Sequence, residues 1–404
     1  MLKGGYMKKK FLIFIKHFII SILIIIVLGL FLLYKIKPLF FSSALSEFTE
    51  KEITGIDEYN LKNDGPYVFY NEYKQEANYI KEKNGKYFVE TIKTLNDKEK
   101  LPVYYYPDSS CFNISLRKNF KKPKAKFKKS DKIIVISDIE GKFRTFRQFL
   151  IKNKVMDKNY NWIFGKGQLV LLGDFVDKDF FETQVLWLIH RLEKQSQSNG
   201  GKVHYLLGNH EINNLWGFTK DSSKKYLLVA DMLKKQRYEF FGKKSYMGRW
   251  LRSKNVIIKI DKYLFVHGGL NPEFLKYNHS LKKYNDIIRK SFDLKGMKLK
   301  YKNNLEKNLL SYKNSPFWYR GYANEKVTQN EIDELCNKFK VKKIIIGHTP
   351  NKHVKTYYNK KVIDIDVLHP EDENSRAYFK TSEGILIEDK EVYMINMHGE
   401  KTKL

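Results

Sequence analysis

Residues 169–177 read Leu-Val-Leu-Leu-Gly-Asp-Phe-Val-Asp, an apolar run that stops at a glycine and an acid. A short apolar run closed by glycine is typical of a buried β-strand. The carboxylate of Asp174 would then follow a buried strand end, where α/β proteins place their chemistry. Because Asp is also a common turn residue, this stretch alone does not separate a functional role from a structural one.

Four other apolar runs end in the same way, each delivering Asp, Glu, Asn or His at its carboxyl end. These side chains supply the oxygen and nitrogen ligands that divalent metals prefer. Since chance would rarely repeat the pattern five times, we predict five buried strands whose ends build one metal site. The four runs precede Ser137-Asp138-Ile139-Glu140-Gly141, Gly208-Asn209-His210-Glu211, His267-Gly268-Gly269 and Gly347-His348-Thr349-Pro350.

The chain has 404 residues, two cysteines and a formal net charge of +30, mostly from lysine. Its length suits a large globular domain with additional segments. Two cysteines are too few for a disulfide framework or a thiolate metal site. The charge could indicate a polyanionic partner, but the lysines are scattered and no nucleic-acid-binding signature occurs. We therefore expect solvated basic faces and no nucleic-acid partner.

The segment from Phe11 to Tyr34 is almost wholly apolar and is interrupted only by Lys16 and His17. It is long enough to cross a hydrocarbon layer of about 30 Å. Lysines are more numerous before it than after it, which predicts a cytoplasmic N-terminus. A cleaved signal peptide is the alternative, but the apolar run is long for one. We expect residues 1–40 to form a cytoplasmic stub and a single membrane anchor, with the folded part outside the cytoplasm.

Residues 41–128 are rich in aromatic side chains and turn residues, so we predict a folded, partly β extension without a catalytic motif. Its last part, Lys118 to Lys129, is a basic connector. Residues 129–404 alternate apolar strands with helical spacing, which indicates an α/β domain. The expected helices carry Phe143, Phe146 and Phe149; Val185, Leu188, Ile189 and Leu192; and Ile332, Leu335 and Phe339 after a capping box at Thr328 to Glu331. Late strands are expected around Val362 to Val367, Ile385 to Ile387 and Val392 to Ile395.

The five strand-end motifs resemble the blocks of the calcineurin-like metallophosphoesterase superfamily, and within it those of the phosphoprotein phosphatases. That group carries GDxHG, GDxxDRG, GNHE, HGG and a late GH or AH; here SDIEG, GDFVDK, GNHE, HGG and GHTP stand in the same order. Pro316 to Gly321 also resembles the Trp-x-Arg-Gly block of bacterial and Shewanella-like phosphatases. The resemblance implies a β-sandwich of two mixed sheets flanked by helices, with metals on loops at one edge.

The same resemblance implies two divalent metal ions. Asp174 matches the carboxylate that bridges them, which is physically needed because two dications about 3.5–4 Å apart repel strongly. Asp138 and Glu140 match the other ligands of the first ion. The matches for the second ion are Asn209, His267 and His348.

His210 matches the general acid that protonates the leaving oxygen, and Asp177 matches its carboxylate partner. Arg320 and Lys178 match phosphate-binding positions. Two residues depart from the family pattern: Glu140 replaces a histidine, and Lys178 replaces an arginine. A carboxylate is a harder ligand than imidazole, so manganese is the expected metal, with magnesium, iron and zinc as alternatives.

These roles predict a metal-dependent phosphomonoester hydrolase, in the first place a phosphoprotein phosphatase acting on a phosphorylated protein or small phosphoester. A nucleotide or dinucleotide polyphosphate hydrolase would use the same chemistry. A non-catalytic surface protein that binds polyanions is a third interpretation, but binding alone needs no general acid. We interpret four other histidines as structural, while one of Asp364 and Asp366 could support a metal ligand. Those histidines are His190, His204, His353 and His369.

Overall fold

The five predicted strands are present, and they divide between two sheets. In one sheet β7 (Lys132–Ile136), β8 (Gln168–Leu171) and β9 (Lys202–Tyr205) run parallel as neighbours. In the other, β11 (Tyr263–Val266) and β12 (Lys343–Ile346) form a parallel pair. The polar residues that follow these strands therefore come from both sheets.

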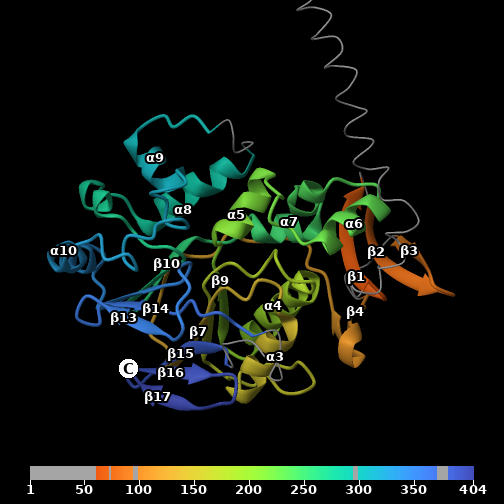
Figure 1. The fold of residues 1–404 in the computed structure, drawn as a ribbon, viewed down its shortest axis with the longest axis horizontal. Coiled ribbons are helices and arrows are strands. Elements are labelled where there is room, and N and C mark those ends of the chain that lie inside the picture. Colours follow the sequence, from red (N-terminus) through yellow and green to blue (C-terminus); the bar gives the residue numbers. More distant parts are fainter. Residues whose placement is uncertain (1–60, 72–73, 94–98, 294–298, 371–380) are drawn as a thin grey trace, which may run out of the picture. The chain divides into compact units, whose positions relative to one another are not determined.

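The computed structural model describes residues 61–404 except 72–73, 94–98, 294–298 and 371–380 (Figure 1). Each main sheet has six strands and mixes parallel with antiparallel pairs. The first has the order β17 (Lys401–Lys403), β16 (Glu391–Asn396), β15 (Glu383–Glu388), β7, β8, β9; the second has the order β13 (Lys355–Tyr357), β14 (Val362–Asp364), β12, β11, β10 (Ile257–Ile260), β6 (Lys126–Phe127). The predicted mixed α/β architecture with two mixed sheets is confirmed.

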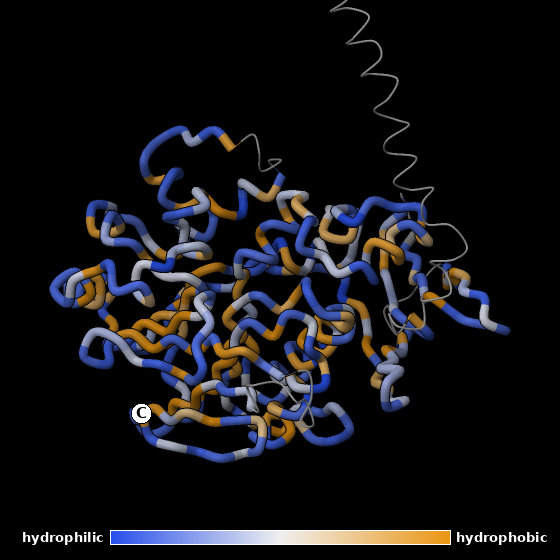
Figure 2. The backbone as a smooth tube through the Cα atoms, in the orientation of Figure 1, coloured by the Kyte–Doolittle hydropathy of each residue, from blue (hydrophilic) through white to orange (hydrophobic). Residues whose placement is uncertain are grey.

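Side chains from both sheets form one hydrophobic core. Val135 and Val170 from the first sheet belong to the same buried cluster as Phe265 and Ile345 from the second. Figure 2 shows that the hydrophobic stretches of the chain concentrate on these strands. Strands covered on both faces read as continuous apolar runs, which is why the sequence pattern was so clear. The core holds the strand ends rigidly, and so positions the loops that follow them.

The predicted helices are present. The expected faces are buried in α3 (Phe143–Lys152) and α4 (Glu182–Ser198). The capping box from Thr328 to Glu331 opens α10 (Gln329–Phe339). The other α-helices of the described residues are α5 (Asn209–Trp216), α6 (Lys224–Met232), α7 (Tyr246–Leu251), α8 (Leu281–Lys290) and α9 (Asn304–Leu310).

The described part of the extension is partly β, as predicted. A three-stranded sheet of β1 (Asp64–Asn71), β2 (Lys74–Lys83) and β3 (Lys86–Lys93) precedes a pair, β4 (Leu101–Tyr105) and β5 (Ser110–Ile114). Buried polar contacts attach it to the α/β domain: Trp187 Nε1 donates to the carbonyl of Pro66 over 2.9 Å, and Gln184 donates to Asp64 over 2.9 Å. The basic connector contributes the edge strand β6, which pairs with β10.

The predicted membrane anchor, Phe11 to Tyr34, lies outside the described residues. Within the described ranges, no helix combines the length and the apolar character that crossing a bilayer requires. The anchor and the orientation inferred from it therefore stay predictions.

Candidate metal centre

The backbone at the strand ends has an unusual conformation. Six of the predicted site residues adopt positive φ, which non-glycine residues rarely do. Such conformations cost of order 1–3 kcal/mol each and cluster at functional sites, where the surrounding structure enforces them. The six are Asp138 (φ 53°), Glu140 (50°), Asp174 (58°), Asp177 (68°), Lys178 (58°) and His348 (71°).

Two glycines allow the loops after β8 and β9 to meet. A Cβ on Gly173 would lie 2.5 Å from the amide nitrogen of Gly208, and a Cβ on Gly208 would lie 2.2 Å from Asp174 Oδ1. Either side chain would force the loops apart. The glycines of the two motifs therefore place Asp174 beside Asn209 and His210.

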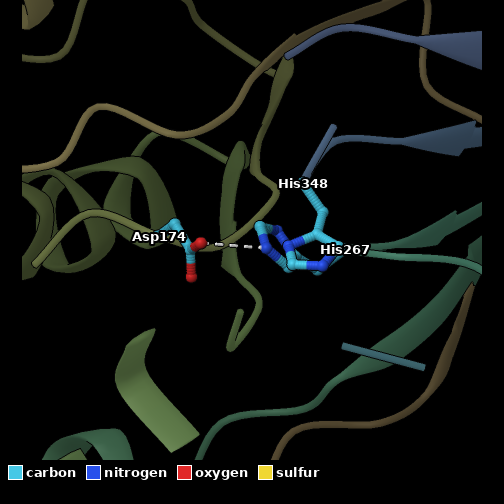
Figure 3. A group of neighbouring side chains, drawn as sticks. All are labelled: Asp174, His267 and His348. Carbon is cyan, nitrogen blue, oxygen red and sulfur yellow. Dashed lines mark ion pairs between the residues drawn. The ribbon is translucent and has the colours of Figure 1, made fainter. Parts of the chain in front are cut away.

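Figure 3 shows Asp174, His267 and His348 side by side, each buried, with ligand atoms within 4.8 Å of one another. His267 Nδ1 donates to the carbonyl of Leu172 over 2.8 Å, so its Nε2 is free to act as a lone-pair donor. That Nε2 lies 3.1 Å from Asp174 Oδ2 and 3.1 Å from Asn209 Oδ1. Two oxygen atoms that can bind a metal thus lie beside this nitrogen.

Such a convergence fits a divalent cation. His348 Nε2 is also buried without a hydrogen-bond partner among the described residues, as expected of a nitrogen that binds a metal. Burial favours the neutral imidazole at His267, but the carboxylates of Asp174 and Asp138 outweigh it and raise the pKa of His267 to about 9. Without a cation the Nε2 atom therefore holds a proton, and a metal ion would take the place of that proton. The residues present therefore fit the metal centre that the sequence predicts.

The predicted first-metal ligands are assembled only in part. Asp138 faces the group: its Oδ1 lies 4.0 Å from His267 Nε2, and its Oδ2 accepts from the amide of His348 over 3.3 Å. Burial, together with Asp174, raises the pKa of Asp138 to about 7. Glu140 instead forms ion pairs with Lys178 and, over 3.5 Å, with Lys142.

His210 and Asp177 are paired as predicted. His210 Nδ1 lies 2.9 Å from Asp177 Oδ2, and the amide of His210 donates to Asp174 Oδ1 over 2.9 Å. Burial disfavours the charged imidazole, but Asp174 and Asp177 raise the pKa of His210 to about 10. Since Nδ1 is held by Asp177, Nε2 is the nitrogen that can give a proton to a substrate.

The sequence interpretation missed two supports of this pair. Asn214 donates to Asp177 Oδ2 over 2.9 Å, and Ser222 donates to Asp177 Oδ1 over 3.1 Å. Asn214 lies four residues after His210 on α5, so helical spacing could have identified it. Nothing in the sequence marks Ser222, because it reaches the site through the path of the loop before α6.

Glu211, the last residue of the Gly208-Asn209-His210-Glu211 motif, connects the loops of the site. Its carboxylate accepts from the amides of Asp174, Phe175 and Gly208 over 2.8–2.9 Å, and from the Tyr205 hydroxyl over 2.8 Å. These donors belong to the loops after both β8 and β9. Glu211 therefore fixes the two motifs relative to each other.

Arg320 is exposed, and it donates to Thr349 Oγ1 over 3.1 Å, next to His348. An aromatic pair lies beside it. The ring of Trp318 packs edge-on against His348 at 5.4 Å, and the ring of Tyr312, which is 71% exposed, lies 4.0 Å from that of Trp318. This pair is a surface that an incoming substrate can contact.

The residues set aside in the sequence have structural partners. His204 hydrogen-bonds to Gln168, His190 to Tyr246, His353 to Glu383, and His369 to both Ser382 and the Ser137 carbonyl. Asp364 and Asp366 are buried, and burial together with Asp138 raises the pKa of both well above its ordinary value. The raised pKa values favour the neutral, protonated form of both acids, so the carboxylate charge of the centre comes from Asp174 and the residues around it.

Comparison with known proteins gives a consistent result. The profile described as calcineurin-like phosphoesterase matches residues 131–352, which include all five motifs. Shewanella-like protein phosphatase 1 of Plasmodium berghei is 27% identical over 252 residues, covering 58% of this chain and just 66% of that protein. Shewanella-like protein phosphatase 2 of Arabidopsis thaliana is 23% identical over 324 residues, covering 68% and 79%.

A solved structure resembles the chain over most of its length. The cold-active protein-tyrosine phosphatase of a psychrophilic Shewanella species superposes with a TM-score of 0.73 at 29% identity. The match covers 84% of this chain and 99% of the Shewanella chain.

Proposed function

The chain belongs to the calcineurin-like phosphoesterase family, and on that premise we propose that it is a metal-dependent phosphoprotein phosphatase. The observation that carries the proposal is the His210–Asp177 pair, 2.9 Å long and tied to the metal centre through the amide of His210. A protein that only binds polyanions has no need for a protonated histidine held beside a metal site. No contact in the described residues favours a nucleotide substrate over a phosphoprotein.

Asp174, Asp138, Asn209, His267 and His348 would hold the metals. When bound, two divalent ions lower the pKa of water and neutralise the charge of the phosphoryl group. Carboxylate ligands suit manganese or magnesium, and manganese is the metal we propose.

The side chains around the metals would orient the phosphate and protonate the leaving group. The guanidinium of Arg320 and the ammonium of Lys178 orient the phosphate oxygens. His210 Nε2 donates a proton to the leaving oxygen, while Asp177 keeps the imidazole in the required tautomer and stabilises its charged form. Asn214 and Ser222 hold Asp177 in place from either side of its carboxylate.

Phosphotyrosine is the substrate we propose. Its support is the exposed Tyr312 ring, which packs at a tilt on Trp318, the ring that contacts His348, and can meet an aromatic leaving group. The Shewanella protein of similar structure is named a protein-tyrosine phosphatase.

A panel of phosphotyrosine and phosphoserine peptides and a dinucleotide polyphosphate tests the function and the substrate together. Tyr312→Ala should raise KM for the phosphotyrosine peptide several-fold and leave the phosphoserine peptide unchanged. Tyr238→Ala, which removes another exposed tyrosine, is the matched control. Preferred hydrolysis of the dinucleotide would contradict the assignment.

We propose that the chain is anchored in the membrane by a single span, with the catalytic domain outside the cytoplasm. The support is the apolar segment from Phe11 to Tyr34 and its flanking lysines. Protease added to spheroplasts should digest the domain. A domain that is protected until the cells are lysed would reverse the orientation.

A further inference from the structure

A cavity of about 540 Å³ lies away from the metal centre. Its lining includes Val203 and His204 on β9, the last strand of the first sheet, and Phe127 and Ile258 on β6 and β10 at one edge of the second. The basic connector and parts of α4 and α7 complete the wall. A volume of this size is typical of pockets that bind small organic ligands.

The wall is strongly cationic. Six basic side chains line the cavity, and its single acid, Glu193, is already paired with Arg117 over 3.1 Å and with Lys254 over 2.5 Å. The other four have no ion pair with a carboxylate anywhere in the described part of the chain. They are Lys121, Lys122, Lys194 and Lys202.

Lys202 is the member of this group that is held in place. It is partly buried, and its Nζ lies 4.5 Å from the centre of the Phe127 ring. Burial and the neighbouring Lys124 lower the pKa of Lys202. An anion in the cavity would stabilise the charged form of Lys202, because it would supply the counter-charge that the protein does not.

The cavity is separate from the catalytic machinery. Lys202 opens β9, whereas Asn209 and His210 follow the opposite end of that strand. None of the lining residues is a predicted metal ligand, general acid or phosphate-binding residue of the active site. A ligand bound there would therefore not be the substrate.

We propose that this cavity binds a compound with a chain of phosphates, either a nucleoside triphosphate or a short inorganic polyphosphate. Four lysine ammonium groups spread over the wall suit a ligand with several charges, and lysine binds phosphate as a point charge. Aromatic and aliphatic side chains in the wall, including Phe120 and Trp250, exclude water and strengthen these attractions. The limited volume excludes a nucleic-acid duplex.

Titration calorimetry on the full-length, metal-depleted protein tests the proposal, with sodium tripolyphosphate and ATP as separate probes. Both should bind if the phosphate chain is recognised, whereas binding of ATP alone would identify a nucleotide site. Replacing Lys121, Lys122, Lys194 and Lys202 with Gln should weaken binding at least tenfold. Hydrolysis of phosphopeptides by the metal-loaded variant should stay unchanged, since the metal centre is untouched.

A matched control replaces four exposed lysines elsewhere, Lys152, Lys158, Lys300 and Lys302, with Gln, so that the net charge changes equally. This control should bind both probes like the parent protein. An equal loss of affinity in the two variants would show that the general positive field of the protein, not the cavity, attracts the anion. Absence of binding to the parent protein, or equally tight binding of citrate, would also overturn the proposal.

Discussion

Lys178 forms an ion pair with Glu140, and these are the two site residues that depart from the usual motifs of the family. Taken separately, each departure would weaken the site: one removes an imidazole ligand, and the other removes a guanidinium fork. Their contact gives another interpretation. The added negative charge of Glu140 is balanced by Lys178 and by Lys142, 3.5 Å away. The two departures are therefore complementary.

This pairing predicts a non-additive double-mutant cycle. Glu140→His leaves Lys178 without its partner, and Lys178→Arg places a larger cation against Glu140, so each single change should lower kcat/KM. The double variant restores the usual family pair and should recover part of the loss, with a coupling of about 0.5–3 kcal/mol. The cycle is measured as kcat/KM on p-nitrophenyl phosphate with a fixed metal. Strict additivity would contradict the complementary pairing.

His210→Asn should keep its metals and lose rate selectively. A general acid contributes typically about 10² to 10⁴ in rate, and its value rises with the pKa of the leaving group. The loss should therefore be much larger for a seryl or alkyl phosphate than for p-nitrophenyl phosphate, whose leaving group departs unprotonated. Asp177→Asn should show the same trend more weakly. If His210→Asn slows both substrates equally, or releases a metal, the acid role belongs to another residue.

Glu211→Gln should destabilise the fold at the site without removing a metal ligand. The amide keeps one acceptor oxygen but cannot receive four donors as the carboxylate does. Because at least one buried donor is left unpaired, we expect a loss of about 1–3 kcal/mol in the free energy of unfolding. Urea denaturation of the metal-depleted proteins measures it. An unchanged midpoint would mean that Glu211 does not fix the two loops.

His204 should make the protein less stable in acid. Burial and the nearby Lys202 and Lys254 lower the pKa of His204 from 6.5 to about 3 in the folded state. In this pH range His204 is protonated in the unfolded chain and neutral in the folded chain. The free energy of unfolding therefore falls as the pH drops from about 6.5 towards 3. At pH 5.5 this contribution is about 1.4 kcal/mol. His204→Gln should abolish this loss, so that the free energy of unfolding falls by about 1.4 kcal/mol less between pH 8 and pH 5.5 than in the parent protein. An equal fall in both proteins would exclude His204 as a cause.

The sequence was sufficient to predict the main sheets because their strands are buried on both faces. Ile133 to Ile136 and Leu169 to Leu172 are continuous apolar runs, and each ends at a glycine- or acid-bearing turn. The helices could also be predicted, since Phe143, Phe146 and Phe149 recur at helical spacing and are buried on one face of α3. The strand order within each sheet was not predicted, because pairing between distant segments depends on packing that leaves no local signature.

Within the site, the metal-ligand candidates could be predicted because each lies within four residues of the end of a strand. The supporting contacts could not. Ser222 reaches Asp177 across a separation of 45 residues, and the ion pair between Glu140 and Lys178 joins two loops from different strands. The aromatic pair of Tyr312 and Trp318 was also missed, since exposed aromatic residues in a loop have no periodicity to mark them.

The central claim is that a carboxylate shared by two metals makes this chain a phosphatase, and Asp174→Asn tests it most directly. Elemental analysis of the purified protein, with turnover measured on the same sample, should find two divalent ions per active parent chain. The variant loses the shared negative charge that offsets the repulsion between the ions, so both its metal content and its turnover should collapse. Two bound ions and normal turnover in Asp174→Asn would contradict the account.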